Sequence, residues 1–79
     1  MPADPTGIGT FLRKLRLQAG IKQVEVCRRS ALKNQHVVRL EFGRLDPRFS
    51  TVKRYADAIG AQIYIGFPKA DESERDGAA

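Results

Sequence analysis

Three glycines, Gly20, Gly43 and Gly60, each stand directly after a segment in which apolar residues recur every three or four positions. That spacing is typical of an amphipathic helix, and glycine is a common helix stop because it readily adopts the left-handed conformation. Stops placed this closely leave room only for short helices. We predict four helices, over residues 8–19, 23–30, 34–42 and 49–59.

The second and third predicted helices are separated by a tight turn at Ser30-Ala31-Leu32. The periodicity directs Val26 and Cys27 inward from one helix and Val37 and Leu40 inward from the next. The outward side of the third helix is then polar, and it carries Lys33, Asn34, Gln35, His36 and Arg39. Side chains of these types have the donors and acceptors that base edges and phosphates recognise.

After Gly60 the apolar period changes from that of a helix to that of a half-buried strand, which we predict over residues 61–67. A single strand leaves its backbone groups unpaired. We therefore expect it to pair with its copy in a second subunit, antiparallel across a two-fold axis. Folding onto its own helices, or completion by a different protein, remain alternatives. The strand residues are Gln62, Ile63, Tyr64, Ile65 and Phe67.

The formal net charge of the 79 residues is +5, and it is unevenly distributed. Residues 6–67 hold twelve Lys and Arg against four acidic residues, a balance of +8, whereas the segment from residue 68 onward has a balance of −2. A basic domain of this kind favours a polyanionic partner. The length indicates one small domain.

Several classes of protein are disfavoured. No apolar run approaches the roughly 20 residues that span a bilayer, and no basic-then-apolar signal sequence is present, so we expect a cytoplasmic protein without membrane contact. One His and one Cys do not make a usual zinc site or a catalytic arrangement. We therefore expect no metal, no cofactor and no enzymatic activity. Cys27, which has no disulfide partner, is more simply a core residue than a redox sensor.

Residues 8–63 resemble the Cro/repressor (XRE-type) helix-turn-helix family. The matching pieces occur in the family's order and spacing: Leu12-Arg13-Lys14-Leu15-Arg16, Gly20-Ile21-Lys22-Gln23, Val37-Val38-Arg39-Leu40-Glu41-Phe42-Gly43, Pro47, Phe49-Ser50-Thr51-Val52 and Ala56-Asp57-Ala58-Ile59-Gly60. Two positions depart from the pattern. Ala31 stands where the family usually has glycine, so we expect a slightly remodelled turn, and Cys27 replaces another small residue.

The resemblance implies a mainly α, four-helix repressor-like domain with a helix-turn-helix, to which the predicted strand adds dimer pairing. It divides the chain into a flexible lead (1–6), the helix-turn-helix domain (7–60), the dimerisation strand (61–67) and a disordered acidic tail (68–79). In this family the start of the third helix enters the major groove of DNA.

The resemblance also assigns roles to individual residues. It implies base contacts by Lys33, Asn34, Gln35 and Arg39; His36 touches a base or phosphate, or is simply exposed. Gln23 corresponds to a residue that binds a phosphate while bracing the third helix. Arg44 and Arg48 are expected at phosphates or as an arm toward the minor groove, and Arg16 with Glu41 as a partly buried ion pair. For Arg28 and Arg29, a solvated face and a DNA contact remain equally open.

Three functions follow as hypotheses. The first is a homodimeric repressor that binds an inverted-repeat operator in double-stranded DNA at its own or a neighbouring promoter; activation through a contact to polymerase stays open. The second is an antitoxin whose acidic tail folds onto a basic toxin; phage or mobile-element control proteins share the same architecture. The third is a protein-interaction module without DNA binding, against which the polar side chains of the third helix count.

Overall fold

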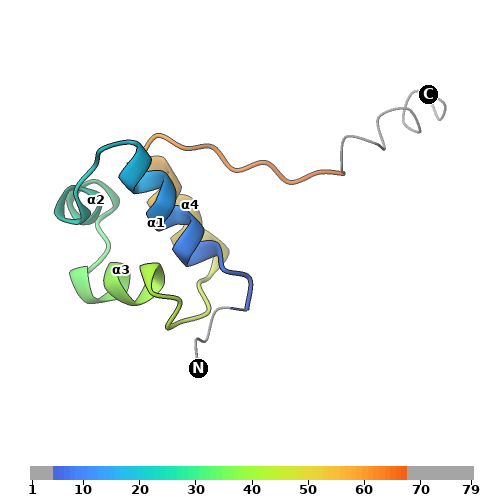
Figure 1. The fold of residues 1–79 in the computed structure, drawn as a ribbon, viewed down its shortest axis with the longest axis horizontal. Helices are drawn as coiled ribbons and strands as arrows, with labels where there is room; N and C mark the ends of the chain where they lie inside the picture. The colour runs from blue at the N-terminus through green and yellow to red at the C-terminus, as the bar shows by residue number, and fades with distance from the viewer. Residues whose placement is uncertain (1–4, 68–79) are drawn as a thin grey trace.

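The computed structural model describes residues 5–67, which form four helices (Figure 1). Their bounds are Ile8–Gln18 for α1, Gln23–Ser30 for α2, Asn34–Glu41 for α3 and Phe49–Ala58 for α4. All four predicted helices are confirmed, and every end agrees with the prediction to within one residue. No helix among the described residues is long and apolar enough to cross a membrane.

The helices pack in pairs around one small core. α1 lies against α3, and α2 lies against α4 and α3. Each helix contributes one apolar face, because its apolar residues recur at helical spacing. The buried core consists of Leu12, Val26, Val37, Leu40, Val52, Tyr55, Ala58 and Ile59.

A glycine turn ends α3 and sets the direction of the loop that follows. Gly43 adopts φ 69°, and its N–H donates to the carbonyl oxygen of Leu40 at 3.1 Å. The N–H of Arg44 donates to the carbonyl oxygen of Arg39 at 2.9 Å. These two bonds define a Schellman motif, which reverses the chain and satisfies the last carbonyl groups of the helix.

The turn between α2 and α3 keeps a left-handed residue even though that residue is alanine. Ala31 has φ 60°, and it is the only non-glycine residue among the described ones with positive φ. The expected remodelling is therefore absent. Ser30 supports the turn instead: its Oγ donates to the carbonyl oxygen of Val26 at 2.6 Å and accepts from the N–H of Leu32 at 3.2 Å. These bonds hold the strained backbone in place.

The helical spacing of the apolar residues predicts inward positions for Phe11 and Phe49, but both side chains are largely exposed. Phe11 is 52% exposed and Phe49 is 57% exposed. Phe11 is turned about 100° around α1 from its neighbour Leu12, which is buried. A core made by four short helices is narrower than the apolar face of each helix. The edge residues of the α1 and α4 stripes therefore remain at the surface.

The strand predicted over residues 61–67 is not formed in the single chain. These residues leave the end of α4 as an extended segment (Figure 1) and have no strand assignment. Tyr64, Ile65 and Phe67 are 85%, 84% and 77% exposed. The physical reason is that the described part of the chain offers no second strand to complete a ladder. The predicted tail at 68–79 and most of the predicted lead at 1–6 lie outside the described residues.

Candidate nucleic-acid interface

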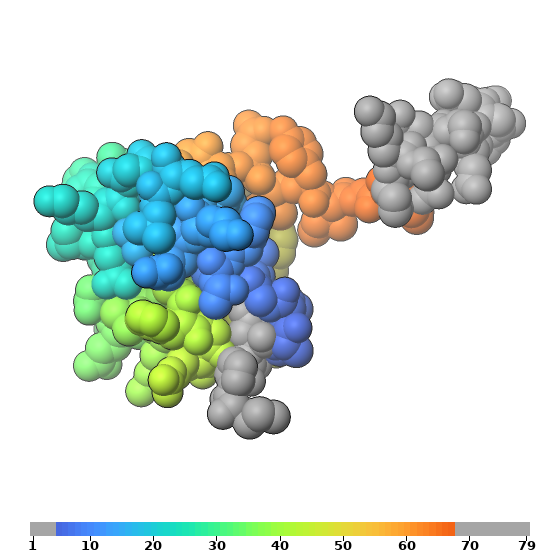
Figure 2. All heavy atoms as spheres, viewed as in Figure 1, coloured from blue at the N-terminus to red at the C-terminus, as the bar shows by residue number. Residues whose placement is uncertain are grey.

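α3 separates its residues cleanly between the core and the solvent. Val37, Leu40 and Glu41 are buried, whereas Asn34, Gln35, His36 and Arg39 are exposed, as is Lys33 directly before the helix. Lys33, Gln35, His36 and Arg39 line one shallow hollow on this surface. Figure 2 shows α3 in green on the lower side of the molecule, away from residues 61–67 in orange. The structure thus brings four of the five predicted base-contact residues together.

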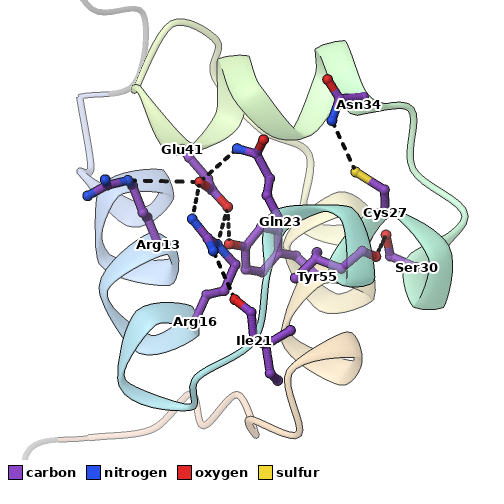
Figure 3. Close-up of polar contacts among 10 residues, drawn as sticks. Arg13, Arg16, Ile21, Gln23, Cys27, Ser30, Asn34, Glu41 and Tyr55 are labelled. Carbon is purple, nitrogen blue, oxygen red and sulfur yellow. Dashed lines mark hydrogen bonds and ion pairs between the residues drawn. The ribbon is translucent and has the colours of Figure 1, made fainter.

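Asn34, the fifth of these residues, is turned toward α2. Its side-chain nitrogen lies 3.8 Å from Sγ of Cys27 and donates a weak hydrogen bond to it (Figure 3). Cys27 is partly buried and not disulfide-bonded. Asn34 therefore helps to fix the start of α3 against α2 and is less free than Gln35 to reach a ligand.

The carboxylate of Glu41, on the buried side of α3, bonds this helix to the other three. Arg16 of α1 donates to both of its oxygens, from Nε at 2.8 Å and from Nη2 at 3.1 Å. Gln23 of α2 donates to Oε1 at 3.1 Å, and the hydroxyl of Tyr55 of α4 donates to Oε2. Figure 3 shows side chains from the other three helices converging on this one group. The orientation of α3 is therefore fixed relative to every other helix.

Burial and pairing act together on these groups. Burial disfavours the charge of Arg16, but the hydrogen bond and the negative charge of Glu41 outweigh it and raise the pKa of Arg16. Burial and the hydrogen bond to Glu41 raise the pKa of Tyr55, which keeps its hydroxyl proton as a donor. Glu41 itself is 1% exposed, and none of the described buried side-chain polar atoms lacks a hydrogen-bond partner. The network is complete.

Three helices begin directly after a basic residue. Lys22 precedes α2, Lys33 precedes α3 and Arg48 precedes α4, and none of them caps its helix with a side-chain hydrogen bond. Helix starts usually carry Ser, Thr, Asp or Asn, whose oxygen accepts from the first-turn N–H groups. A basic residue leaves these donors uncapped at the positive end of the helix dipole and adds a cation. Such a start favours an anionic ligand, above all phosphate.

The family model that matches the chain is described as "Helix-turn-helix domain", and it covers residues 8–63, more than half of the sequence. The chain belongs to this helix-turn-helix family. Comparison with curated proteins finds no match, and comparison with solved structures also finds none. Membership indicates a DNA-binding domain of a typically non-enzymatic kind, with α2 and α3 as the helix-turn-helix and α3 as the recognition helix.

The loop after the recognition helix presents two further cations. Arg44 and Arg48 are both exposed, and they flank a segment that begins at the Gly43 turn and ends at the start of α4. Neither side chain forms a hydrogen bond or an ion pair with another of the described residues. Their placement beside the helix-turn-helix suits the phosphate contacts that the sequence assigns to them.

The arginines of α2 are engaged within the domain. Arg28 and Arg29 both bind Glu25, and these bonds lower the pKa of the Glu25 carboxyl to about 2. Arg29 also donates to the carbonyl oxygen of Ala58 at 3.1 Å, at the end of α4. In return Arg54 of α4 donates to the carbonyl oxygen of Ser30, from Nη2 at 2.8 Å. Arg29 thus joins the ends of α2 and α4. The sequence left open whether Arg28 and Arg29 are solvated or contact DNA, and for Arg29 the structure gives a third role within the domain.

Three residues have roles in the structure that the sequence does not predict. Lys22 stands directly before α2, where Ser, Thr, Asp or Asn is usual, and a basic residue at that position is the sequence signal that could have identified it. Helical periodicity predicts only that Tyr55 lies on the apolar side of α4; that its hydroxyl donates to Glu41 depends on the three-dimensional position of Glu41. Leu45 lies in the loop after α3, where no periodic signal gives it a role, and it lines the hollow beside the recognition helix.

Proposed function

We propose that this protein is a homodimeric, sequence-specific transcriptional regulator that represses its own or a neighbouring promoter by occupying an inverted-repeat operator. The observation that carries the proposal is the recognition helix. Its buried side is fixed by Glu41 and the core, while its exposed side carries Gln35, His36 and Arg39. A fixed helix with amide and guanidinium groups outward suits direct readout of the major groove.

Gln23 supports the same proposal. One N–H of its side-chain amide donates to Glu41 at 3.1 Å. An amide nitrogen carries two hydrogens, so the second is available to a phosphate oxygen beside the uncapped start of α2. Together with Lys22, Arg44 and Arg48, Gln23 would fix the register of the duplex, and the exposed residues of α3 would read the bases.

Selection from random DNA followed by gel shift tests the proposal. We expect one enriched half-site sequence in inverted repeat, and affinity that falls steeply with salt. Gln35→Ala and Arg39→Ala should each reduce the preference for the selected site over random DNA by about 1–3 kcal/mol. Lys53→Ala, which removes an exposed cation from α4, is the matched control and should keep the preference.

Equal affinity of the unaltered protein for selected and random DNA would refute sequence-specific binding. That result would favour the protein-interaction module. Loss of affinity without loss of preference in Arg39→Ala would instead assign Arg39 to a phosphate.

The dimer is proposed from the extended segment and the groove beside it. Tyr64, Ile65 and Phe67 are more than three-quarters exposed, and their backbone has no ladder partner among the described residues. Phe49, Ile63 and Tyr64 line a groove between α4 and this segment. Pairing of two such segments across a two-fold axis would satisfy both backbones and cover these side chains. Two recognition helices would then read two half-sites about one helical turn apart.

Removal of residues 62–79 tests the role of the segment. The core residues and the helix ends all precede residue 62, so we expect the shortened chain to remain folded by circular dichroism. By light scattering we expect the shortened chain to be monomeric and the full chain to be dimeric. A chain ending at residue 67 keeps the segment and should remain dimeric. A shortened chain that stays dimeric would contradict the proposal.

An antitoxin function would add a protein partner to the same DNA-binding unit. The acidic residues assigned to that contact lie at 68–79, outside the described residues. A toxin encoded by the adjacent gene would identify this case. The cytoplasmic location expected from the sequence is part of the proposal, because the protein must reach DNA.

A further inference from the structure

A hollow of about 270 Å³ lies on the recognition surface, between α3 and the loop that follows it. It is lined by Lys33, Gln35, His36, Arg39 and Leu45. Four of these side chains are polar or charged and belong to the recognition helix or its N-cap. Leu45 is the one apolar member, and it comes from the loop. Contact between Leu45 and a ligand is most favourable where the ligand presents an apolar group, because such contact removes apolar surface from water.

Leu45 is held firmly in this position. It packs against the buried core, so only part of its side chain faces the hollow. The Schellman turn at Gly43 brings the chain back beside the exposed side of α3, two residues before Leu45. The side chain is therefore a fixed feature of the surface, whereas Lys33 and Arg39 are long and exposed.

The major groove of DNA offers one apolar group at its base edges, the C5-methyl of thymine; its other readable groups are donors and acceptors. A base edge with hydrogen-bonding groups, or a phosphate, would lose hydrogen bonds to water on contact with Leu45 and form none in return, so that contact is unfavourable. A methyl group gains, because contact removes apolar surface of both partners from water. We propose that Leu45 forms a subsite for the C5-methyl group of a pyrimidine in the operator, and that it thereby determines specificity at that base pair.

This inference rests on the proposed DNA-binding function and goes beyond it by naming a base feature and the residue that reads it. The same chemistry is offered by 5-methylcytosine, since it carries the same methyl group at the same edge. The alternative is that Leu45 is a core residue whose exposed part contacts no base. The three cases differ in their response to removal or addition of a single methyl group.

The experiment uses the full-length protein and the operator obtained by selection. Each thymine of one half-site, and its symmetry mate, is replaced in turn by deoxyuridine, which removes only the methyl group. We expect one position at which affinity falls three- to five-fold per half-site, equivalent to about 0.7–1 kcal/mol at 1.4 kcal/mol per tenfold change. In Leu45→Ala the ratio of thymine to deoxyuridine affinity at that position should fall to one.

The ratio is taken within each protein, so a general loss of folding in Leu45→Ala cancels. If that variant does not fold, Leu45→Val should reduce the ratio part of the way. Leu17→Ala, which shortens an exposed apolar side chain of α1, is the matched control and should leave the ratio unchanged.

A second arm replaces each cytosine by 5-methylcytosine. A gain of affinity that depends on Leu45, without any deoxyuridine effect, would assign the subsite to methylated cytosine and still support it. If an operator is selected but no methyl effect depends on Leu45, the subsite is refuted while the proposed function stands. If no DNA is selected, the proposed function fails, and the subsite fails with it.

Discussion

Glu41 is the residue whose loss should affect the domain most. Its carboxylate is 1% exposed and receives hydrogen bonds from Arg16, Gln23 and Tyr55. Glu41→Ala leaves the buried Arg16 without its counter-charge, so we expect a loss of about 3–5 kcal/mol in the free energy of unfolding. Tyr55→Phe removes one hydrogen bond to a charged group, and we expect about 1.5–3 kcal/mol. Both are measured by urea unfolding.

The exposed pair Lys53–Asp57 provides the control for this prediction. Its atoms lie 3.4 Å apart at the surface of α4, and Asp57→Ala should change stability by less than about 1 kcal/mol. Equal effects of Asp57→Ala and Glu41→Ala would contradict the central role of the buried carboxylate.

Ala31 is a residue at which stability should increase. A left-handed φ of 60° costs an L-residue roughly 1–2 kcal/mol, whereas glycine adopts it freely. Part of this gain is offset by the greater freedom of glycine in the unfolded chain. We expect Ala31→Gly to raise the free energy of unfolding by roughly 0.5–1 kcal/mol and the melting temperature by a few degrees.

Ala19→Gly is the matched control, because Ala19 has φ −78° and gains nothing from glycine. It should leave the melting temperature unchanged or lower it. A rise in Ala19→Gly as large as that in Ala31→Gly would show that relief of strain is not the cause.

At this scale the sequence predicted some contacts and not others. Arg16 and Glu41 were paired by family resemblance, and the structure brings them together. The part played by Tyr55 was not predictable, because periodicity identifies a buried position without identifying what a buried hydroxyl meets. The prediction of a remodelled turn at Ala31 is wrong, because the support from Ser30 depends on side-chain hydrogen bonds that sequence spacing does not show.

At the scale of elements, the basic helix starts predict a conflict between stability and binding. Lys22→Asp gives α2 a capping acceptor and a favourable charge at its N-terminus, so we expect a gain of about 0.5–1 kcal/mol in stability. The same change places a negative charge where a phosphate is proposed, so operator affinity should fall at least tenfold. Thermal unfolding and gel shift measure the two effects on one protein.

Lys14→Asp reverses the same charge on the exposed side of α1, away from any helix start. It controls for the overall charge of the domain. If Lys14→Asp and Lys22→Asp weaken DNA binding equally, the start of α2 is not a phosphate site. Lys22→Ser separates capping from charge reversal, because it should stabilise α2 with a smaller loss of affinity.

The helices were predictable because apolar period and glycine stops are local signals, and both are strong here. The strand at 61–67 was predicted from an equally clear alternation, but a strand is defined by its partner, and the described part of one chain contains none. The exposure of Phe11 was not predictable either, since the width of the core depends on how the helices cross.

At the scale of the whole molecule, the two proposed contact surfaces lie on different sides. α3 and its loop face one way, and residues 61–67 leave from the other end of the bundle (Figures 1 and 2). This arrangement leaves both surfaces accessible at once, as the proposed binding of DNA and of a second copy requires. The basic balance of residues 6–67 suits the first contact, and the exposed apolar side chains of the segment suit the second.

Because α3 is held through its buried side, the DNA sequence that such a protein recognises can change without loss of the fold. Gln35, His36 and Arg39 take no part in the bonds that orient the helix, which run through Glu41 and the core. A library randomised at these three positions should consequently yield mostly folded members with divergent operators. Retargeting by natural drift or by design then requires few compensating changes elsewhere in the chain.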